Sequence, residues 1–152
     1  LKNNFYAKIQ SINLSLNDPR ITKITIIASL IEREALRDNE KPIISSVIAN
    51  RLDAGMSLDI DATLQYIKGK SSGKWWSVPT IEDKKINSEY NTYMNVGLPP
   101  APIANPGLEA IKAALNPQKT NYYYYIHDSK GDVHFARTLE EHNLNIVRYN
   151  VN

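Results

Sequence analysis

The feature that most limits how this chain can fold is its most apolar segment, between residues 21 and 36. Apolar side chains recur there every three or four residues, which is the spacing of a helix packed against a core. Asp18 and Pro19 come just before this segment and suit the N-cap and the first turn of a helix. We therefore predict a core helix over residues 19–37.

Two glutamates near the end of this segment differ in their surroundings. Glu34 has Arg37 three residues on, so a surface ion pair explains it. Glu32 has no basic residue three or four positions away, and apolar neighbours would raise the pKa of its carboxyl group and keep it as a proton donor. A glutamate that reaches water at the rim of the apolar stripe explains the same pattern. The helix alone leaves both readings of Glu32 open. The neighbours one turn away are Ala28, Ser29, Ala35 and Leu36.

The remaining helices are expected from caps and periodic apolar residues. We predict a short lead-in helix within residues 1–16, a second helix from Asn39 to Gly55, a brief helix after Asp61, and one after Pro106. Residues 68–77 are expected to form a loop.

A hairpin is predicted late in the chain. A tyrosine-rich strand over residues 121–126 and a strand over 133–136 flank a turn at 128–132. Thr138 and Glu141 form a capping box that begins a final helix. The fold class is therefore α+β, mostly helical, with a late antiparallel β-hairpin and proline-rich cleft loops.

Two loops have unusual composition. Trp75 and Trp76 lie in the predicted loop, and either stack on sugar rings or a partner, or fold back onto the core. The segment 88–107 is dense in proline and suits a rigid cleft wall.

Composition removes several function classes. With 152 residues and 42% hydrophobic content the chain fits one domain, and a net charge of +2 gives no electrostatic reason for nucleic-acid binding. The absence of cysteine excludes thiol catalysis, and the three histidines lack metal-ligand spacing, so we expect no metal and no cofactor. Serine-hydrolase and nucleotide-binding motifs are missing too. The chain keeps aromatic, amide and hydroxyl side chains together with Glu32, a carboxyl group that could donate a proton, and this combination fits a carbohydrate site.

Six segments, taken in their order along the chain, carry a family resemblance. They are Ala-Ser-Leu-Ile-Glu-Arg-Glu (28–34), Val-Ile-Ala-Asn-Arg-Leu (47–52), Asp-Ala-Thr-Leu-Gln-Tyr (61–66), Tyr-Asn-Thr-Tyr (90–93), Gly-Leu-Pro-Pro-Ala-Pro-Ile-Ala-Asn-Pro-Gly (97–107) and Glu-His-Asn (141–143). In residue sequence and order these segments resemble the YceG-like family, the MltG-type endolytic murein transglycosylases of bacteria. Proline is common in that family where this chain has Ala62 and Glu89, which affects loop shape more than chemistry.

The resemblance implies a lyase that cleaves the MurNAc-β-1,4-GlcNAc bond of peptidoglycan without water and leaves 1,6-anhydroMurNAc ends. It places the catalytic acid/base on Glu32, the first glutamate of its Glu-Lys/Arg-Glu element. We expect the substrate cleft to be shaped or lined by Asp61, Thr63, Asn91, Thr92, Tyr93, Asn105, His142 and Asn143.

The resemblance also sets expectations for organisation and place. We expect residues 1–152 to be a single catalytic domain with a lead-in segment over 1–20, separated from the family's N-terminal membrane anchor and LysM-like portion. The expected partners are glycan strands and proteins of cell-wall synthesis, with no nucleic acid and no membrane contact except through the missing anchor. The expected location is the extracytoplasmic face of the bacterial membrane, with this fragment soluble.

Two other functions remain open at this stage. One is a peptidoglycan-binding module without catalysis. The other is a hydrolytic muramidase, which would use Asp61 as a second carboxyl group facing Glu32.

Overall fold

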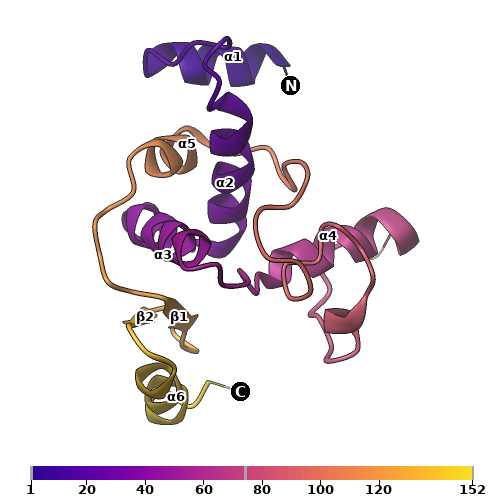
Figure 1. The fold of residues 1–152 in the computed structure, drawn as a ribbon, viewed down its shortest axis with the longest axis vertical. Helices are drawn as coiled ribbons and strands as arrows, with labels where there is room; N and C mark the ends of the chain where they lie inside the picture. Colours follow the sequence, from indigo (N-terminus) through magenta and orange to yellow (C-terminus); the bar gives the residue numbers. More distant parts are fainter. Residues whose placement is uncertain (1, 74, 152) are drawn as a thin grey trace.

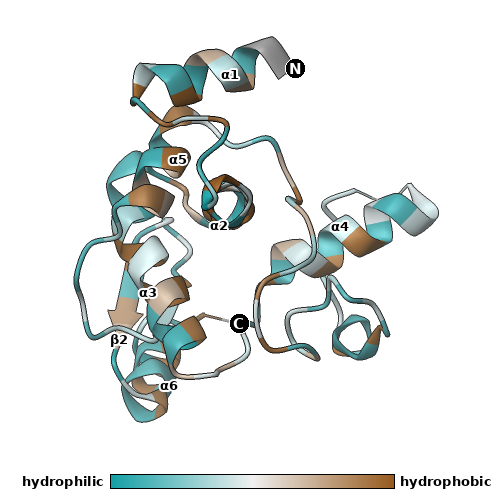
Figure 2. Ribbon diagram, turned by 45° about the horizontal axis from the view of Figure 1, so that its top comes forward, coloured by the Kyte–Doolittle hydropathy of each residue, from teal (hydrophilic) through white to brown (hydrophobic). Residues whose placement is uncertain are grey.

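Helix α2 (Ile21–Glu34) lies at the centre of the fold. Ala28, Leu30 and Ile31 are completely buried, because the apolar stripe of this helix faces neighbours on several sides. Helices α5 and α3 pack on one side of α2 and α4 on the other, as the end-on view of α2 in Figure 2 shows. The core helix predicted from the sequence is confirmed.

The computed structural model describes residues 2–73 and 75–151. Within these parts, helices make up most of the regular structure and two strands form one small sheet, so the predicted α+β class is confirmed. No helix in the described ranges is long and apolar enough to cross a membrane. The other elements are α1 (Lys2–Ser11), the 3₁₀ turn η1 (Asp38–Glu40), α3 (Lys41–Asp53), α4 (Asp61–Ser72), η2 (Asp83–Lys85), α5 (Leu108–Leu115), β1 (Tyr124–His127), β2 (Val133–Ala136) and α6 (Leu139–Arg148).

Helix α2 ends at Glu34, earlier than the predicted end at residue 37. The cause is the carboxylate of Glu40, which accepts hydrogen bonds from the backbone N–H groups of Leu36 (2.9 Å) and Arg37 (3.3 Å). Ala35 has an extended backbone, so the chain leaves the helix there and enters η1.

Helix α4 is longer than predicted. It continues through residues 68–72, which the sequence analysis assigned to a loop, and Gly73 ends it in the left-handed conformation with φ of 70°. Glycine suits this C-cap because it has no Cβ to clash there. Residues 75–77 keep the predicted loop character, and residue 74 of that loop lies outside the described residues.

The proline-rich segment runs along α2 without regular structure. All of residues 88–107 are described, and none of them lies in a helix or strand. The Ile103 N–H donates to the Ser29 hydroxyl of α2 at 3.1 Å. Pro102, Asn105 and Pro106 line a hollow of about 400 Å³ together with residues of α1.

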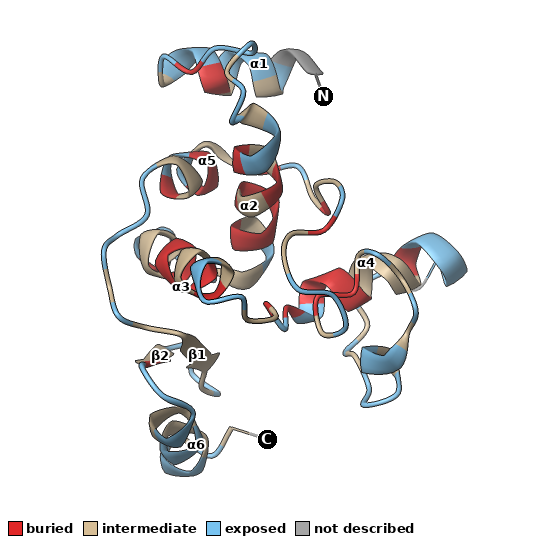
Figure 3. Ribbon diagram, viewed as in Figure 1, coloured by how far each residue is buried: buried red, intermediate tan, exposed pale blue. Residues whose placement is uncertain are grey.

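The predicted hairpin is confirmed. Strands β1 and β2 pair antiparallel with Tyr124 opposite Ala136, and Asp128 holds the turn by accepting from the backbone N–H groups of Lys130 and Asp132. Helix α6 follows, and all ten of its residues are described and none is buried. Figure 3 shows the contrast with the buried faces of α2, α3 and α5.

We predict that Leu30→Ala lowers the free energy of unfolding by about 2–5 kcal/mol, because it leaves a cavity in the centre of the core. Leu144→Ala is the matched control, since Leu144 is 62% exposed and the change should cost less than about 0.5 kcal/mol. Urea denaturation of both variants provides the measurement. Equal losses would contradict the core position of Leu30.

Candidate active site

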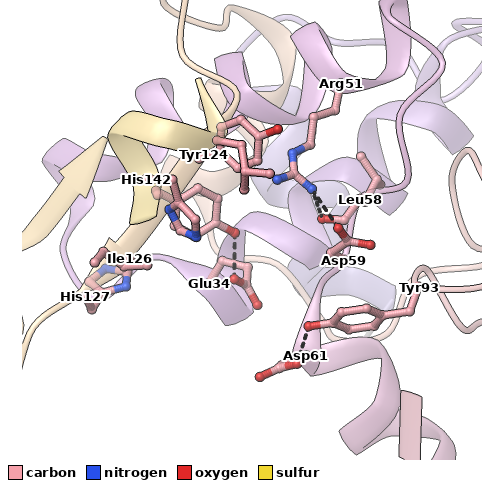
Figure 4. A pocket seen from close by; sticks show the side chains of 12 residues that line it. Glu34, Arg51, Leu58, Asp59, Asp61, Tyr93, Tyr124, Ile126, His127 and His142 are labelled. Atoms are coloured by element: carbon pink, nitrogen blue, oxygen red, sulfur yellow. Dashed lines mark hydrogen bonds and ion pairs between the residues drawn. The ribbon is translucent and has the colours of Figure 1, made fainter. Parts of the chain in front are cut away.

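A pocket of about 440 Å³ opens where the hairpin and α6 meet the ends of α2, α3 and α4. Figure 4 shows carboxylate, guanidinium, imidazole and phenol groups around it. Charged and aromatic groups gathered in one concavity are typical of a binding or catalytic site. The lining residues are Glu34, Arg51, Leu58, Asp59, Asp61, Tyr93, Tyr124, Tyr125, Ile126, His127, Leu139 and His142.

Glu34 stands at the last residue of α2 and points into this pocket. Its carboxylate accepts a 2.6 Å hydrogen bond from the Tyr125 hydroxyl of β1. Burial raises the pKa of Glu34 above its ordinary value; the hydrogen bond from Tyr125 opposes this rise and the negative charge of Asp61 adds to it. The predicted surface pair between Glu34 and Arg37 is wrong, because Arg37 instead binds Asp132 at 3.0 Å.

Asp61 and Tyr93 form a second polar pair in the pocket. The Tyr93 hydroxyl donates to the Asp61 carboxylate at 2.7 Å. Burial and the neighbouring carboxylates raise the pKa of Tyr93, so the phenol stays protonated and keeps donating. Asp61 therefore keeps a fixed position in the same pocket as Glu34, as Figure 4 shows.

Arg51 joins three parts of the chain at the pocket. Its Nε donates to the Tyr123 carbonyl at 2.6 Å, and its Nη1 donates to the carbonyls of Ser57 (3.0 Å) and Leu58 (3.1 Å). The same Nη1 lies 3.3 Å from the Asp59 carboxylate. Several acceptors around one nearly buried guanidinium fix both its position and its charge.

The two pocket histidines have different partners. The His142 ring stacks on Tyr124 with centroids 5.2 Å apart, and burial followed by the charge of Arg51 lowers the pKa of His142. The Nδ1 atom of His142 is buried and has no hydrogen-bond partner within the described chain. His127 instead lies 3.2 Å from the buried carboxylate of Glu40, through its Nε2.

Comparison with known proteins identifies the family. The model of the YceG-like family matches residues 2–148, nearly the whole chain. The chain belongs to the YceG-like family. The resemblance seen in the sequence is thereby confirmed.

Three similar proteins from this family are informative. A Bacillus subtilis protein named endolytic murein transglycosylase is 40% identical over 146 residues, which cover 96% of this chain and 39% of that protein. A Streptococcus pneumoniae protein of the same name is 33% identical over 147 residues, covering 95% of this chain and 26% of that protein. The crystal structure of a yceG-like protein from Listeria monocytogenes matches with a TM-score of 0.76 and 37% identity, over 93% of this chain and 44% of that one. The YceG-like chain thus spans about a quarter to two fifths of these curated relatives.

Of the residues predicted to shape or line the cleft, Asp61, Tyr93 and His142 line the pocket. Three others, Thr63, Asn91 and Thr92, are buried in the protein interior.

These three interior residues make hydrogen bonds that support the pocket. The Thr92 hydroxyl accepts from the Ile60 N–H at 3.0 Å, and the Thr63 hydroxyl donates to the Ile60 carbonyl at 2.7 Å. The Asn91 side chain accepts from the Tyr93 N–H at 3.0 Å. These hydrogen bonds fix the backbone beside Asp61 and at Tyr93. The three residues therefore shape the pocket by positioning Asp61 and Tyr93.

The remaining predicted residues lie elsewhere. Glu32 is outside the group of residues that lines the pocket: its carboxylate accepts from the Gly107 N–H at 3.1 Å and lies 3.7 Å from the Lys41 ammonium. Of the two readings of Glu32 left open by the sequence, these contacts and a side chain that is 33% exposed fit the glutamate that reaches water. Asn105 lines the separate hollow beside α1, and Asn143 is exposed on α6.

Sequence reasoning missed several lining residues, including Glu34, Arg51, Tyr125 and His127. Two signals were available. Tyr125 lies in the predicted strand and His127 directly follows its predicted end, and because β1 continues through His127 the two side chains share a face. Arg51 interrupts the apolar pattern near the end of the predicted second helix, where a buried cation needs partners. No comparable signal distinguished Glu34.

No group of three or more His, Cys, Asp or Glu side chains that could hold a metal occurs in the described ranges. The chemistry that the pocket can perform rests on its carboxyl groups, phenols, imidazoles and guanidinium. A partly buried carboxyl group that resists ionisation, next to a polar cavity, is suited to donate a proton.

We predict that Glu34→Gln raises the melting temperature at pH 7. Ionising the half-buried Glu34 costs free energy in the folded state only, because its folded pKa is raised. The gain in melting temperature over wild type should vanish as the pH falls below 4.5, the ordinary pKa of glutamate, since Glu34 is then protonated in both the folded and the unfolded state. Thermal melts between pH 3 and pH 8 measure this difference.

Glu141→Gln is the control, and we expect it to change the melting temperature in the opposite direction. The Arg137 backbone N–H and guanidinium lower the pKa of Glu141, so its charge stabilises the fold. Its variant should be less stable at neutral pH, with the loss disappearing as the pH falls below 4.5. A Glu34→Gln protein that melts below wild type at pH 7 would contradict the burial of the Glu34 charge.

Proposed function

We propose that this chain is the glycan-cleaving part of an endolytic peptidoglycan lytic transglycosylase, acting on the extracytoplasmic side of the membrane, where peptidoglycan lies. The names of its relatives support peptidoglycan as the substrate. The observation that carries the proposal is Glu34, a carboxyl group with a raised pKa that lines the pocket together with charged and aromatic groups and accepts a hydrogen bond from Tyr125 there.

Glu34 is the general acid and base of this proposal, in place of Glu32. As an acid it protonates the glycosidic oxygen of the MurNAc-β-1,4-GlcNAc bond, and the bond from that oxygen to C1 breaks. As a carboxylate it then takes the proton of the muramoyl C6 hydroxyl while O6 bonds to C1. The proton returns to Glu34, no water is consumed, and a 1,6-anhydro ring results. One carboxyl group is sufficient, since the substrate supplies the nucleophile.

Other groups in the pocket support this chemistry. Tyr125 holds the Glu34 carboxyl by its 2.6 Å hydrogen bond and fixes its orientation. Asp61, held by Tyr93, supplies negative charge that stabilises the positive charge developing at C1. His142 has a free buried Nδ1 available for a hydrogen bond to a sugar hydroxyl or amide.

A hydrolytic muramidase is the second candidate, because Asp61 shares the pocket with Glu34. In a hydrolase, Asp61 would act as nucleophile or activate water, and two carboxyl groups would flank the scissile bond. The family names favour the transglycosylase. The two candidates differ in their products.

Glu34→Gln is expected to reduce turnover of purified glycan strands about 100-fold or more, because the amide cannot donate and accept the proton. Glu32→Gln should retain most activity, since its amide oxygen can still accept from the Gly107 N–H. Release of soluble muropeptides from isolated sacculi measures both. The reverse pattern would restore the assignment to Glu32 made from the sequence.

The products should carry anhydro ends and be lighter by one water than those of a muramidase that acts on the same bond. Mass spectrometry of the digest provides the measurement. Reducing ends would overturn the transglycosylase and make Asp61→Asn the next variant to test. Binding with no product at all would instead support the non-catalytic module.

A further inference from the structure

The loop after α4 presents two large aromatic side chains to solvent. Trp75 is 47% exposed and Trp76 is 44% exposed, with ring centroids 5.9 Å apart and planes at 44°. Indoles have a large apolar area, and a fold gains free energy by covering it. Each ring is partly covered and partly exposed, so the inner side of the pair packs back on the protein while the outer side remains open to a sugar or a partner.

The inner side of Trp75 is nevertheless firmly supported. Its indole packs on Gly69 so closely that the Cβ of any larger residue there would overlap the ring. The edge of Trp75 meets the Tyr66 ring at 6.1 Å, and Tyr66 in turn packs on Tyr90 at 5.0 Å. Trp75 is therefore a fixed surface rather than a side chain that moves freely.

Trp76 is held against the helix that carries Glu34. The Arg33 guanidinium lies 3.5 Å from the centroid of the Trp76 ring, a close cation–π contact. Arg33 is adjacent to Glu34 in the last turn of α2. Trp76 also adopts a φ of +63°, which is costly for a residue that is not glycine and needs support from its surroundings. The aromatic surface is thus attached to Arg33, the residue that precedes Glu34 in α2.

We propose that Trp75 and Trp76 form a second sugar-binding subsite, which takes an N-acetylhexosamine ring of the same glycan strand that enters the pocket. This inference rests on the proposed function. The apolar C–H face of a β-linked sugar stacks on an indole, and a glycan strand places such rings repeatedly along its length. A glycan strand is longer than the pocket, and the contact of Trp76 with Arg33, the neighbour of Glu34 in α2, is the observation that connects the aromatic surface to the pocket.

The subsite gives a role to a loop that the pocket chemistry does not use. Glycan binding at the loop would hold the strand on both sides of the Arg33–Glu34 turn and favour cleavage within strands over cleavage at their ends. Short oligosaccharides, which fill the pocket alone, would not sense the loop.

The chain contains only these two tryptophans, so tryptophan fluorescence excited at 295 nm reports this loop alone. We expect titration of the Glu34→Gln protein with chitohexaose to shift the emission to shorter wavelength, and chitobiose to leave it nearly unchanged. Unchanged emission when calorimetry shows that chitohexaose is bound would overturn the proposal.

Trp75→Ala and Trp76→Ala, in the Glu34→Gln background, should weaken chitohexaose binding about tenfold in calorimetry, and Trp76→Phe should restore most of it. Val78→Ala is the matched control, because Val78 belongs to the same loop and is 84% exposed.

In the active protein, the alanine variants should raise KM for glycan strands and change kcat little. If both alanine variants kept the KM and the affinity of the wild type, the subsite would be overturned, while the proposed function would stand as long as the wild type cleaves glycan. If the wild type did not cleave glycan, the proposed function itself would be overturned.

Discussion

The polar contacts that attach the hairpin to the helical core are the constraint on which the pocket depends. Arg51 reaches from α3 to the carbonyl of Tyr123, and the Asn50 amide donates to the carbonyls of Thr120 (3.0 Å) and Tyr122 (2.8 Å). These contacts place β1 opposite the end of α2. Because Arg51 is a nearly buried charge, each hydrogen bond that it makes contributes about 1.5–3 kcal/mol, more than a surface ion pair.

A buried carboxylate completes this attachment. Glu40 is only 3% exposed, and it binds both the chain that leaves α2 and His127 of β1. The same residue therefore ends α2 at Glu34 and holds the strand that supplies the hydroxyl bound to Glu34. Helix termination and site geometry have a common cause.

Local patterns in the sequence were sufficient for most of the fold. Helical periodicity identified α2, and the turn at residues 128–132 identified the hairpin, because both depend on neighbours in the chain. The site depends on contacts across about 90 residues, such as Tyr125 with Glu34, which no spacing rule contains. Spacing instead suggested Arg37 as the partner of Glu34, and it failed because the helix ends before Arg37 is reached.

The sequence did not separate the residues that shape the pocket from those that line it. Thr63, Asn91 and Thr92 shape it from the interior, since they are buried and bind the backbone. From sequence, a hydroxyl or amide that satisfies the backbone cannot be told from one that faces a substrate, since burial decides between them.

The exposed character of α6 has a consequence for motion. A unit held by polar contacts and little apolar burial opens locally at a lower free energy than the whole protein unfolds. In β1, β2 and α6 only Ala136 is buried, with Tyr125 and Phe135 packed on the core from partly buried positions, so we expect this unit to open at a lower free energy than α2. Its opening removes Tyr125 and His142 from the pocket together while Glu34 stays on the core. The pocket is therefore assembled at the boundary between the apolar helical core and a unit with less apolar burial, a boundary across which a long polymer could enter from the side instead of being threaded by its end.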